Sequence, residues 1–247
     1  METKRRAVVT GAASGIGRAI AAKLVTDGHD VLSVDLDPDP GGPGVPFAAD
    51  LTTADGNRAS IERAIEEFDE IDLLVPCAGF QHVAPIAGFP EDQWAALLGI
   101  LLTSPSLLAK YAWDSLKESG RGQIVVIASV HGLVASPFKA GYVAAKHGVV
   151  GLTKVLALEG GPHGIRAVAL CPGYVRTPLV EGQIPDQARA HGMSEDQVLT
   201  EMILAPHAVK ELVEPEEVAD TVAFLLTPAG RAFTGVALPM DMGWSAR

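Results

Sequence analysis

Short apolar runs alternate along the chain with longer segments in which apolar residues recur every three or four positions. Such runs are typical of strands buried on both faces of a parallel sheet, and the recurring pattern is typical of amphipathic helices. The predicted strands cover residues 5–10, 30–37, 47–50, 71–75, 123–129, 165–170 and 235–240. The predicted helices follow the first strand as far as residue 28 and then cover residues 54–68, 91–117, 137–159 and 215–226. This alternation predicts an α/β fold with one doubly wound parallel sheet of about seven strands and a site at the carboxyl ends of the strands.

Two segments lack a clear period. Residues 38–46, PDPGGPGVP, predict an irregular loop because proline and glycine disfavour a helix. Residues 180–213 are polar and are interrupted by Pro185 and Pro206, so we predict a small, mobile helical flap over the substrate, taken as residues 175–213. The periodic pattern resumes after each segment, and 247 residues suit one domain, so residues 1–247 are predicted to form a single domain.

A glycine motif lies between the first predicted strand and the helix that follows it. Gly11, Gly15 and Gly17 occur in TGAASGIG, at the turn where the helix begins. Small residues there let a pyrophosphate approach the backbone N–H groups of the helix N-terminus. A tight turn without a ligand is the alternative, which the strand, turn and helix order disfavours.

Asp35 ends the second predicted strand. A carboxylate at this place accepts hydrogen bonds from ribose hydroxyls and repels a 2′-phosphate, and the next residue is Leu36 rather than a cation. The sequence therefore favours NAD over NADP. A solvated loop acid is the alternative, and it suits Asp37 and Asp39 better than Asp35.

Tyr142 and Lys146 are four residues apart in an alanine-rich segment, so we expect them on one face of a helix. At about 5 Å and an effective dielectric near 20, the ammonium favours the phenolate by about 3 kcal/mol, or about two pKa units. Ser129 ends an apolar strand and can offer its hydroxyl to the same substrate oxygen. This pattern predicts acid–base catalysis, although an exposed lysine beside a half-buried tyrosine is also possible.

Charge and composition narrow the possible partners. The net charge of −11 argues against a nucleic-acid or anionic membrane surface. Cys77 and Cys171 have neither metal-ligand spacing nor a CxxC pattern, so we expect packed thiols, no metal site and a reducing compartment. The apolar run after the N-terminal charges is too short for a signal segment, and the longest apolar segment, residues 95–102, is too short to span a bilayer. We therefore expect a soluble cytoplasmic protein that binds neither nucleic acid nor membrane.

The motifs that carry chemistry together resemble the short-chain dehydrogenases/reductases over essentially the whole chain. The matching features are TGAASGIG, Asp35, CAG at residues 77–79, Ser129, Tyr142, Lys146 and CPGYVRTP at residues 171–178. The resemblance implies a Rossmann-type fold and a homotetramer. It implies that Tyr142 is the acid–base group, that Lys146 binds the nicotinamide ribose and lowers the Tyr142 pKa, and that Ser129 orients the substrate oxygen.

The resemblance also implies a set of residues that contact NAD. They are Gly11, Ser14, Gly15, Ile16, Gly17, Asp35, Asp50, Leu51, Ala78, Gly79, Tyr142, Lys146, Pro172, Gly173, Val175 and Thr177.

Further segments, among them ASVHGLVAS, VRTPLVEGQI and the terminal GWSAR, resemble a subgroup of the family that oxidises a small 3-hydroxy acid. The resemblance implies that the substrate contacts Gln81, Ser129, His131, Lys139, Tyr142, Tyr174 and Gln183. One ammonium with neutral donors is sufficient to hold a small carboxylate without a metal. Taken singly, each of Gln81, His131, Lys139 and Gln183 suits a surface or capping role as well.

The chain departs from the family pattern at four places. Pro76 and Cys77 replace two asparagines, Val168 replaces another, and Tyr174 stands where the subgroup has a tryptophan. Leu101 occupies the place of a fourth catalytic residue, an asparagine whose backbone carbonyl holds a relay water.

Leu101 has two interpretations. It belongs to an apolar stripe at helical spacing, so packing alone explains it. Pro105, however, has no N–H to give to the Leu101 carbonyl four residues earlier. We predict that Pro105 opens the helix here and that the freed carbonyl binds the relay water.

The sequence leaves three functions open. The first is NAD-dependent oxidation of a small 3-hydroxy acid. The second is another short-chain hydroxy-acid or secondary-alcohol dehydrogenase, because a few pocket residues decide the substrate on such a scaffold. The third is a nucleotide-binding protein with impaired turnover, which the altered asparagine positions would allow.

Overall fold

Seven parallel strands form one sheet at the centre of the protein. The computed structural model describes residues 4–246. The strand order is β3-β2-β1-β4-β5-β6-β7, so the order reverses between β1 and β4. The strands are β1 Arg6–Thr10, β2 Asp30–Asp35, β3 Val45–Ala48, β4 Leu73–Val75, β5 Gln123–Ile127, β6 Arg166–Pro172 and β7 Ala237–Met240. The predicted doubly wound sheet is therefore confirmed.

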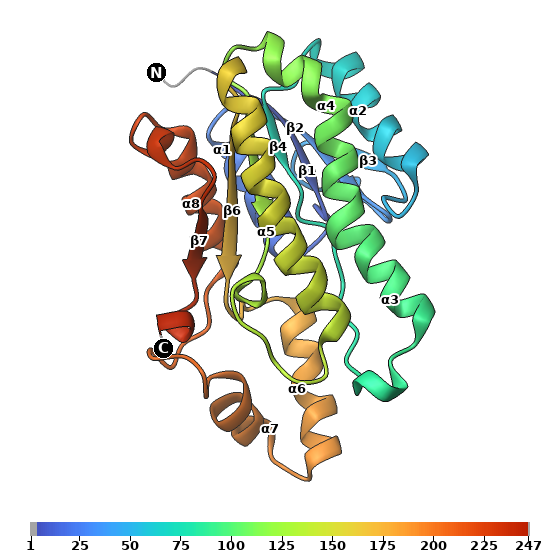
Figure 1. The fold of residues 1–247 in the computed structure, drawn as a ribbon, viewed down its shortest axis with the longest axis vertical. Coiled ribbons are helices and arrows are strands. Elements are labelled where there is room, and N and C mark those ends of the chain that lie inside the picture. The colour runs from blue at the N-terminus through green and yellow to red at the C-terminus, as the bar shows by residue number, and fades with distance from the viewer. Residues whose placement is uncertain (1–3, 247) are drawn as a thin grey trace.

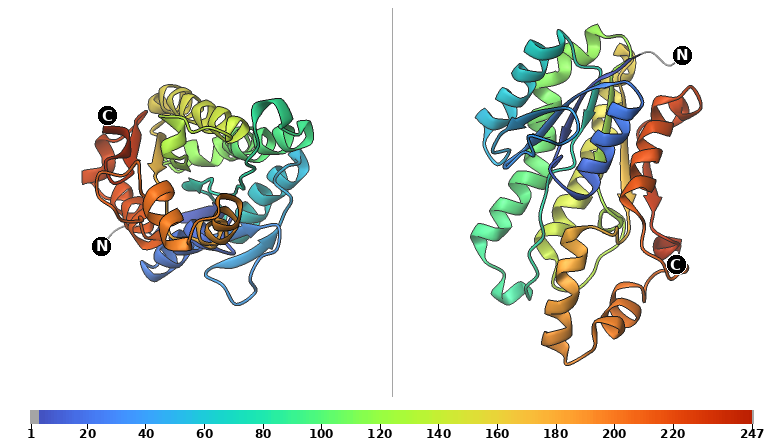
Figure 2. Two further views of the ribbon diagram at one scale, coloured as in Figure 1. Left: turned by 90° about the horizontal axis from the view of Figure 1, so that it is seen from below. Right: turned by 180° about the vertical axis from the view of Figure 1, so that it is seen from behind.

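Helices cover both faces of the sheet (Figure 1). The α-helices are α1 Gly15–Thr26, α2 Ala54–Phe68, α3 Glu91–Leu98, α4 Ser104–Glu118, α5 Ala140–Gly160, α6 Pro178–His191, α7 Glu195–Gln197 and α8 Pro215–Leu226. Helices α2, α4 and α5 lie on one face, and α1 and α8 lie on the other, as the rear view in Figure 2 shows. Helices α6 and α7 extend beyond the carboxyl ends of β6 and β7.

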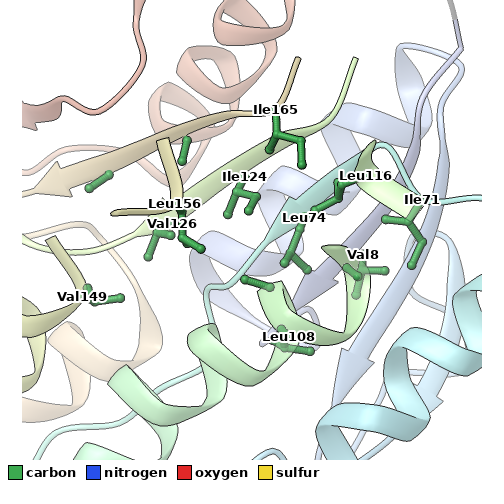
Figure 3. Close-up of a cluster of buried hydrophobic side chains, with 14 of the residues drawn as sticks. Val8, Ile71, Leu74, Leu108, Leu116, Ile124, Val126, Val149, Leu156 and Ile165 are labelled. Carbon is green, nitrogen blue, oxygen red and sulfur yellow. The ribbon is translucent and has the colours of Figure 1, made fainter. Parts of the chain in front are cut away.

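Alternate residues of each strand pack against the helices on opposite faces of the sheet. Val8 and Leu74 are paired across β1 and β4 and belong to the cluster with α2, α4 and α5, part of which Figure 3 shows. Val9 and Val75 are the next pair along, and they belong to the cluster with α1 and α8. Successive residues of a strand point to opposite faces, so continuous apolar runs are needed when both faces are covered.

The long apolar helical segment is a core element. By length and composition Glu91–Glu118 is the one described segment that could cross a membrane, and it is longer than the apolar run at residues 95–102. Its α4 part contacts both α2 and α5, and Leu108 and Leu116 of α4 are buried in the core. The segment is therefore a core helix.

Several element bounds differ from those predicted. β3 begins at Val45, inside the predicted loop, and α5 begins at Ala140 rather than at residue 137. Phe138 has a φ of 67°, and Lys139 has φ −118° and ψ 32°, so neither residue is helical. The long helix is interrupted by a π-helical turn, η2 Gly99–Thr103, between α3 and α4.

The predicted flap has a small apolar core of its own. It comprises α6, which contains Pro185, α7, and a second π-helical turn, η5 Val198–Ile203. Val198 and Ile203 are buried in a cluster separate from the two sheet layers. The flap is therefore helical, as predicted, and its mobility stays a prediction.

Candidate active site

A cavity of about 470 Å³ lies at the carboxyl ends of the strands, beside the glycine turn. Gly11 has a φ of 68°, and a Cβ there would lie 2.8 Å from the Cα of Ala78. A Cβ on Gly17 would lie 2.2 Å from the carbonyl oxygen of Gly11. The turn therefore requires glycine at both positions, and it leaves the N-terminus of α1 open to the cavity. This cradle and its volume fit a dinucleotide with its pyrophosphate at the helix N-terminus.

Most of the predicted cofactor residues meet in this cavity. Those in its wall are Gly11, Ser14, Gly15, Ile16, Gly17, Asp35, Asp50, Leu51, Ala78, Gly79 and Thr177. The wall of an adjoining cavity includes Tyr142, Pro172, Gly173 and Val175, and Ile16 and Thr177 belong to both walls. Lys146 lies behind these walls, buried, with its Nζ donating to the carbonyl of Ile127 at 2.7 Å.

Asp35 is held against the glycine turn by backbone donors. Its Oδ2 accepts from the N–H of Ala13 at 3.0 Å, and its Oδ1 accepts from the N–H of Leu36 at 2.8 Å. These bonds place a carboxylate in the wall at the end of β2, which is where a ribose would be recognised.

Tyr142, Lys146 and Ser129 come together as predicted. Tyr142 and Lys146 are on α5, with Lys146 Nζ 5.6 Å from the Tyr142 ring centre, and Ser129 follows β5. Burial raises the pKa of Tyr142 to about 12, with the Ser129 hydroxyl opposing this in part. Burial also lowers the pKa of Lys146 to about 8. The predicted lowering of the Tyr142 pKa is therefore wrong for this structure, because loss of solvent outweighs the hydrogen bond with Ser129.

The adjoining cavity, of about 100 Å³, brings together the predicted substrate residues. Its wall includes Gln81, Ser129, His131, Lys139, Tyr142 and Tyr174. The backbone of Gln183 lies in α6, but its side chain is outside the described residues.

Lys139 and His131 are two ionisable groups in the wall of this small cavity. Lys139 is only 8 % exposed, and its Nζ donates to the Tyr174 hydroxyl at 3.1 Å. His131 is 4 % exposed, and burial followed by the charge of Lys139 lowers its pKa to about 3. His131 is therefore neutral, and the cavity presents one ammonium among neutral donors. Gln81 adds a buried Nε2 that has no partner within the described residues.

The sequence interpretation missed part of the wall of the small cavity. Trp244 stacks on Tyr174, with ring centres 5.5 Å apart, and meets His131 edge-on at 5.2 Å. His207 is buried and packs near Trp244, with the two ring centres 5.7 Å apart. The terminal GWSAR contributed to the resemblance, but no spacing in the sequence indicated that Trp244 reaches residues more than 60 positions away.

The two cysteines and Val168 lie among packed apolar residues. Burial raises the pKa of Cys77 to about 12 and that of Cys171 to about 11, so both thiols are protonated and neither is an activated nucleophile. Val168 is fully buried in β6.

The packing of Leu101 and the geometry of the helix around it agree with the two interpretations of this residue. Its side chain is buried beside Leu97 and Ala145, with Tyr142 against the same cluster. The helix departs from α-geometry at this point, and the Ser104 N–H bonds to the carbonyl of Gly99, five residues earlier. The predicted departure from α-helical geometry is confirmed, and the free Leu101 carbonyl with its relay water stays a prediction.

Comparison with known proteins gives matches over nearly the whole chain. A family model described as Enoyl-(Acyl carrier protein) reductase matches residues 11–245. A D-beta-hydroxybutyrate dehydrogenase of Rhizobium meliloti is 40% identical, covering 98% of this chain and 99% of its own. Another, of Cupriavidus necator, is 37% identical over 98% of each chain. The ligand-free aldohexose dehydrogenase of Thermoplasma acidophilum has a TM-score of 0.92 at 32% identity, covering 99% of this chain and 95% of its own.

Proposed function

Because this chain belongs to the short-chain dehydrogenase/reductase family of oxidoreductases, we propose that it oxidises D-3-hydroxybutyrate to acetoacetate with NAD as hydride acceptor. The observation that carries the proposal is the buried ammonium of Lys139. It lines the same small cavity as Ser129 and Tyr142, and no carboxylate of the described residues forms an ion pair with it. A buried cation without a counter-ion favours an anionic substrate.

The substrate anion is held by charge and neutral donors. The ammonium of Lys139 pairs with the carboxylate, and the amide of Gln81 and the imidazole of His131 lie in the same wall. A cavity of about 100 Å³ suits a short acid. Holding the carboxylate at one end keeps the hydroxyl carbon beside Tyr142, which lowers the entropy cost of reaching the reacting geometry.

Proton transfer is assigned to Tyr142. Its phenolate takes the proton of the substrate hydroxyl while Ser129 holds that oxygen. Lys146, fixed by the carbonyl of Ile127, binds the nicotinamide ribose and stabilises the phenolate. When bound, NAD accepts the hydride, and its positively charged oxidised ring favours ionisation of the nearby phenol. Reduction of acetoacetate reverses these steps, with Tyr142 as the acid.

We also propose that the protein is a cytoplasmic homotetramer. Leu158 is 79 % exposed and Val155 48 % exposed on α5, and Phe224 is exposed on α8. Apolar side chains on two outer helices are suited to contacts between subunits. Light scattering on the purified protein measures the oligomeric state directly.

The catalytic assignment is tested by following NADH formation with D- and L-3-hydroxybutyrate, each with NAD and with NADP. Turnover of the D-acid with NAD, lost in Tyr142→Phe while NADH binding is kept, is the expected result. If NADH binds and neither acid reacts, other hydroxy acids and secondary alcohols replace the proposed substrate. Failure of that whole panel would favour a nucleotide-binding protein with impaired turnover.

A further inference from the structure

A cation stands next to the carboxylate expected to recognise the adenosine ribose. Arg18 lies in the first turn of α1, and its Nη1 is 3.5 Å from the carbonyl oxygen of Ala13. The N–H of the same residue, Ala13, donates to Asp35. Arg18 and Asp35 therefore approach the same turn of backbone. An arginine near this carboxylate is the kind of group that accepts the 2′-phosphate of NADP.

Asp39 forms an ion pair with Arg18. Its Oδ2 lies 2.6 Å from Arg18 Nη1, and it is the only carboxylate paired with Arg18 within residues 4–246. The Oδ1 of Asp39 accepts from the N–H of Gly41 at 2.9 Å, and the Asp39 carbonyl accepts from Gly42 at 3.0 Å. The hydrogen bond from Arg18 holds the pKa of Asp39 below its ordinary value, so the carboxylate is ionised at neutral pH. The hydrogen bonds of the loop therefore position Asp39 for the ion pair, and the ion pair connects the loop to α1.

The pair contributes little to the stability of the fold. Arg18 and Asp39 have side chains that are 44 % and 40 % exposed, and ion pairs so exposed to solvent are weak. The consequence of the pair is local, because it cancels the charge of Arg18 at the backbone turn that Asp35 also contacts. With Arg18 neutralised, a 2′-phosphate meets the carboxylate of Asp35 without compensation.

We propose that Asp39 is a cofactor-selectivity residue that excludes NADP by holding Arg18. The inference rests on the proposed use of NAD, and it adds a second determinant to Asp35. Asp39 acts outside the cavity wall, through the charge of Arg18. Without Asp39 the guanidinium is free to turn towards a 2′-phosphate and bind it with charge-assisted hydrogen bonds.

The test compares binding of NADH and NADPH, followed by nucleotide fluorescence without any substrate. Asp39→Asn keeps an oxygen acceptor for Gly41 and removes the charge. We expect it to tighten NADPH binding about fivefold, the ratio that corresponds to two unit charges about 4 Å apart in water. NADH binding should change less than about twofold, and the NADPH gain should shrink as salt is added.

Two further variants separate the proposed contact from a general change of charge. Asp37→Asn removes the same charge from the same loop, and Asp37 forms no ion pair in the described part of the chain. We expect it to leave NADPH affinity nearly unchanged. Adding Arg18→Met to Asp39→Asn should abolish the gain, because the cation is then gone.

The outcomes overturn different claims. An equal NADPH gain in Asp37→Asn, or no gain in Asp39→Asn, overturns the role of Asp39 while wild-type NADH binding leaves the proposed function standing. A gain that persists after Arg18→Met also overturns it. Wild-type protein that binds neither nucleotide would overturn the proposed function and this inference together.

Discussion

Acid should destabilise this protein through His131, a histidine that the fold keeps neutral. Its ring is packed edge-on against Tyr142 and Trp244, and its Nε2 lies 2.9 Å from the hydroxyl of Ser136. Burial, then the charges of Lys139 and His147, lower its pKa from 6.5 to about 3. The folded protein therefore takes up this proton far less readily than the unfolded chain does.

The sign and size of the effect follow from proton linkage. Between pH 6.5 and about 3 the unfolded chain binds the proton and the folded protein does not, so the free energy of unfolding falls as the pH falls. The stabilisation that comes from the lowered pKa of His131 is fully present above pH 6.5. With these two pKa values, His131 accounts for a loss of about 2 kcal/mol between pH 8 and pH 5.

Urea denaturation at pH 8 and pH 5 measures this loss by comparing wild type with His131→Gln. Glutamine keeps a polar side chain near Ser136 and does not titrate. Whatever stability the variant loses at pH 8, its further loss on going to pH 5 should be smaller than that of wild type by about 2 kcal/mol. His163→Gln is the control, because His163 is exposed at the end of η4 Gly161–His163 and should follow wild type.

An equal pH dependence in wild type and His131→Gln would refute the reasoning. A second measurement does not depend on the variant folding: in the NMR spectrum of wild type, the His131 ring resonances should not titrate between pH 8 and pH 5. A His131 titration midpoint near pH 6 would equally show that burial does not keep this ring neutral.

Two other predictions concern single contacts. A Cβ on Gly79 would lie 2.4 Å from Leu101 Cδ2, so Gly79→Ala should reduce the free energy of unfolding by about 1–3 kcal/mol. Urea denaturation of this variant, of Leu101→Ala and of the double variant should give non-additive losses, and additive losses would contradict the contact. Lys139→Met should raise the KM for the hydroxy acid about tenfold or more with a smaller change in kcat, measured by steady-state kinetics. Its NADH affinity should stay the same, and a parallel loss of NADH binding would show that Lys139 has a wider structural role.

Much of the fold was determined by local patterns. Apolar runs at Val8, Leu74 and Ile124 need cover on both faces, and the sheet has helices on both faces. The glycine turn was placed correctly because a close backbone approach at Gly11 and Gly17 admits no side chain. Asp35 was placed correctly because it ends the buried apolar run of β2. Motif spacing also located Tyr142 and Lys146, since four residues make about one helical turn.

Other features depend on how distant segments pack. The start of α5 was misplaced because Phe138 adopts a left-handed backbone that its own propensity does not indicate. Trp244 enters the small cavity from the end of the chain, and only the packed structure brings it against Tyr174.

Tyr142 shows most clearly which properties follow from the sequence and which follow from the tertiary structure. Its position one helical turn from Lys146 follows from the sequence alone, because spacing within a helix is a local property. Its pKa does not, because the charged form of a group is penalised by every neighbour that excludes water, and those neighbours come from the whole chain. Sequence thus determined that Tyr142 and Lys146 share one helical face, and tertiary structure decided how readily each of them carries charge.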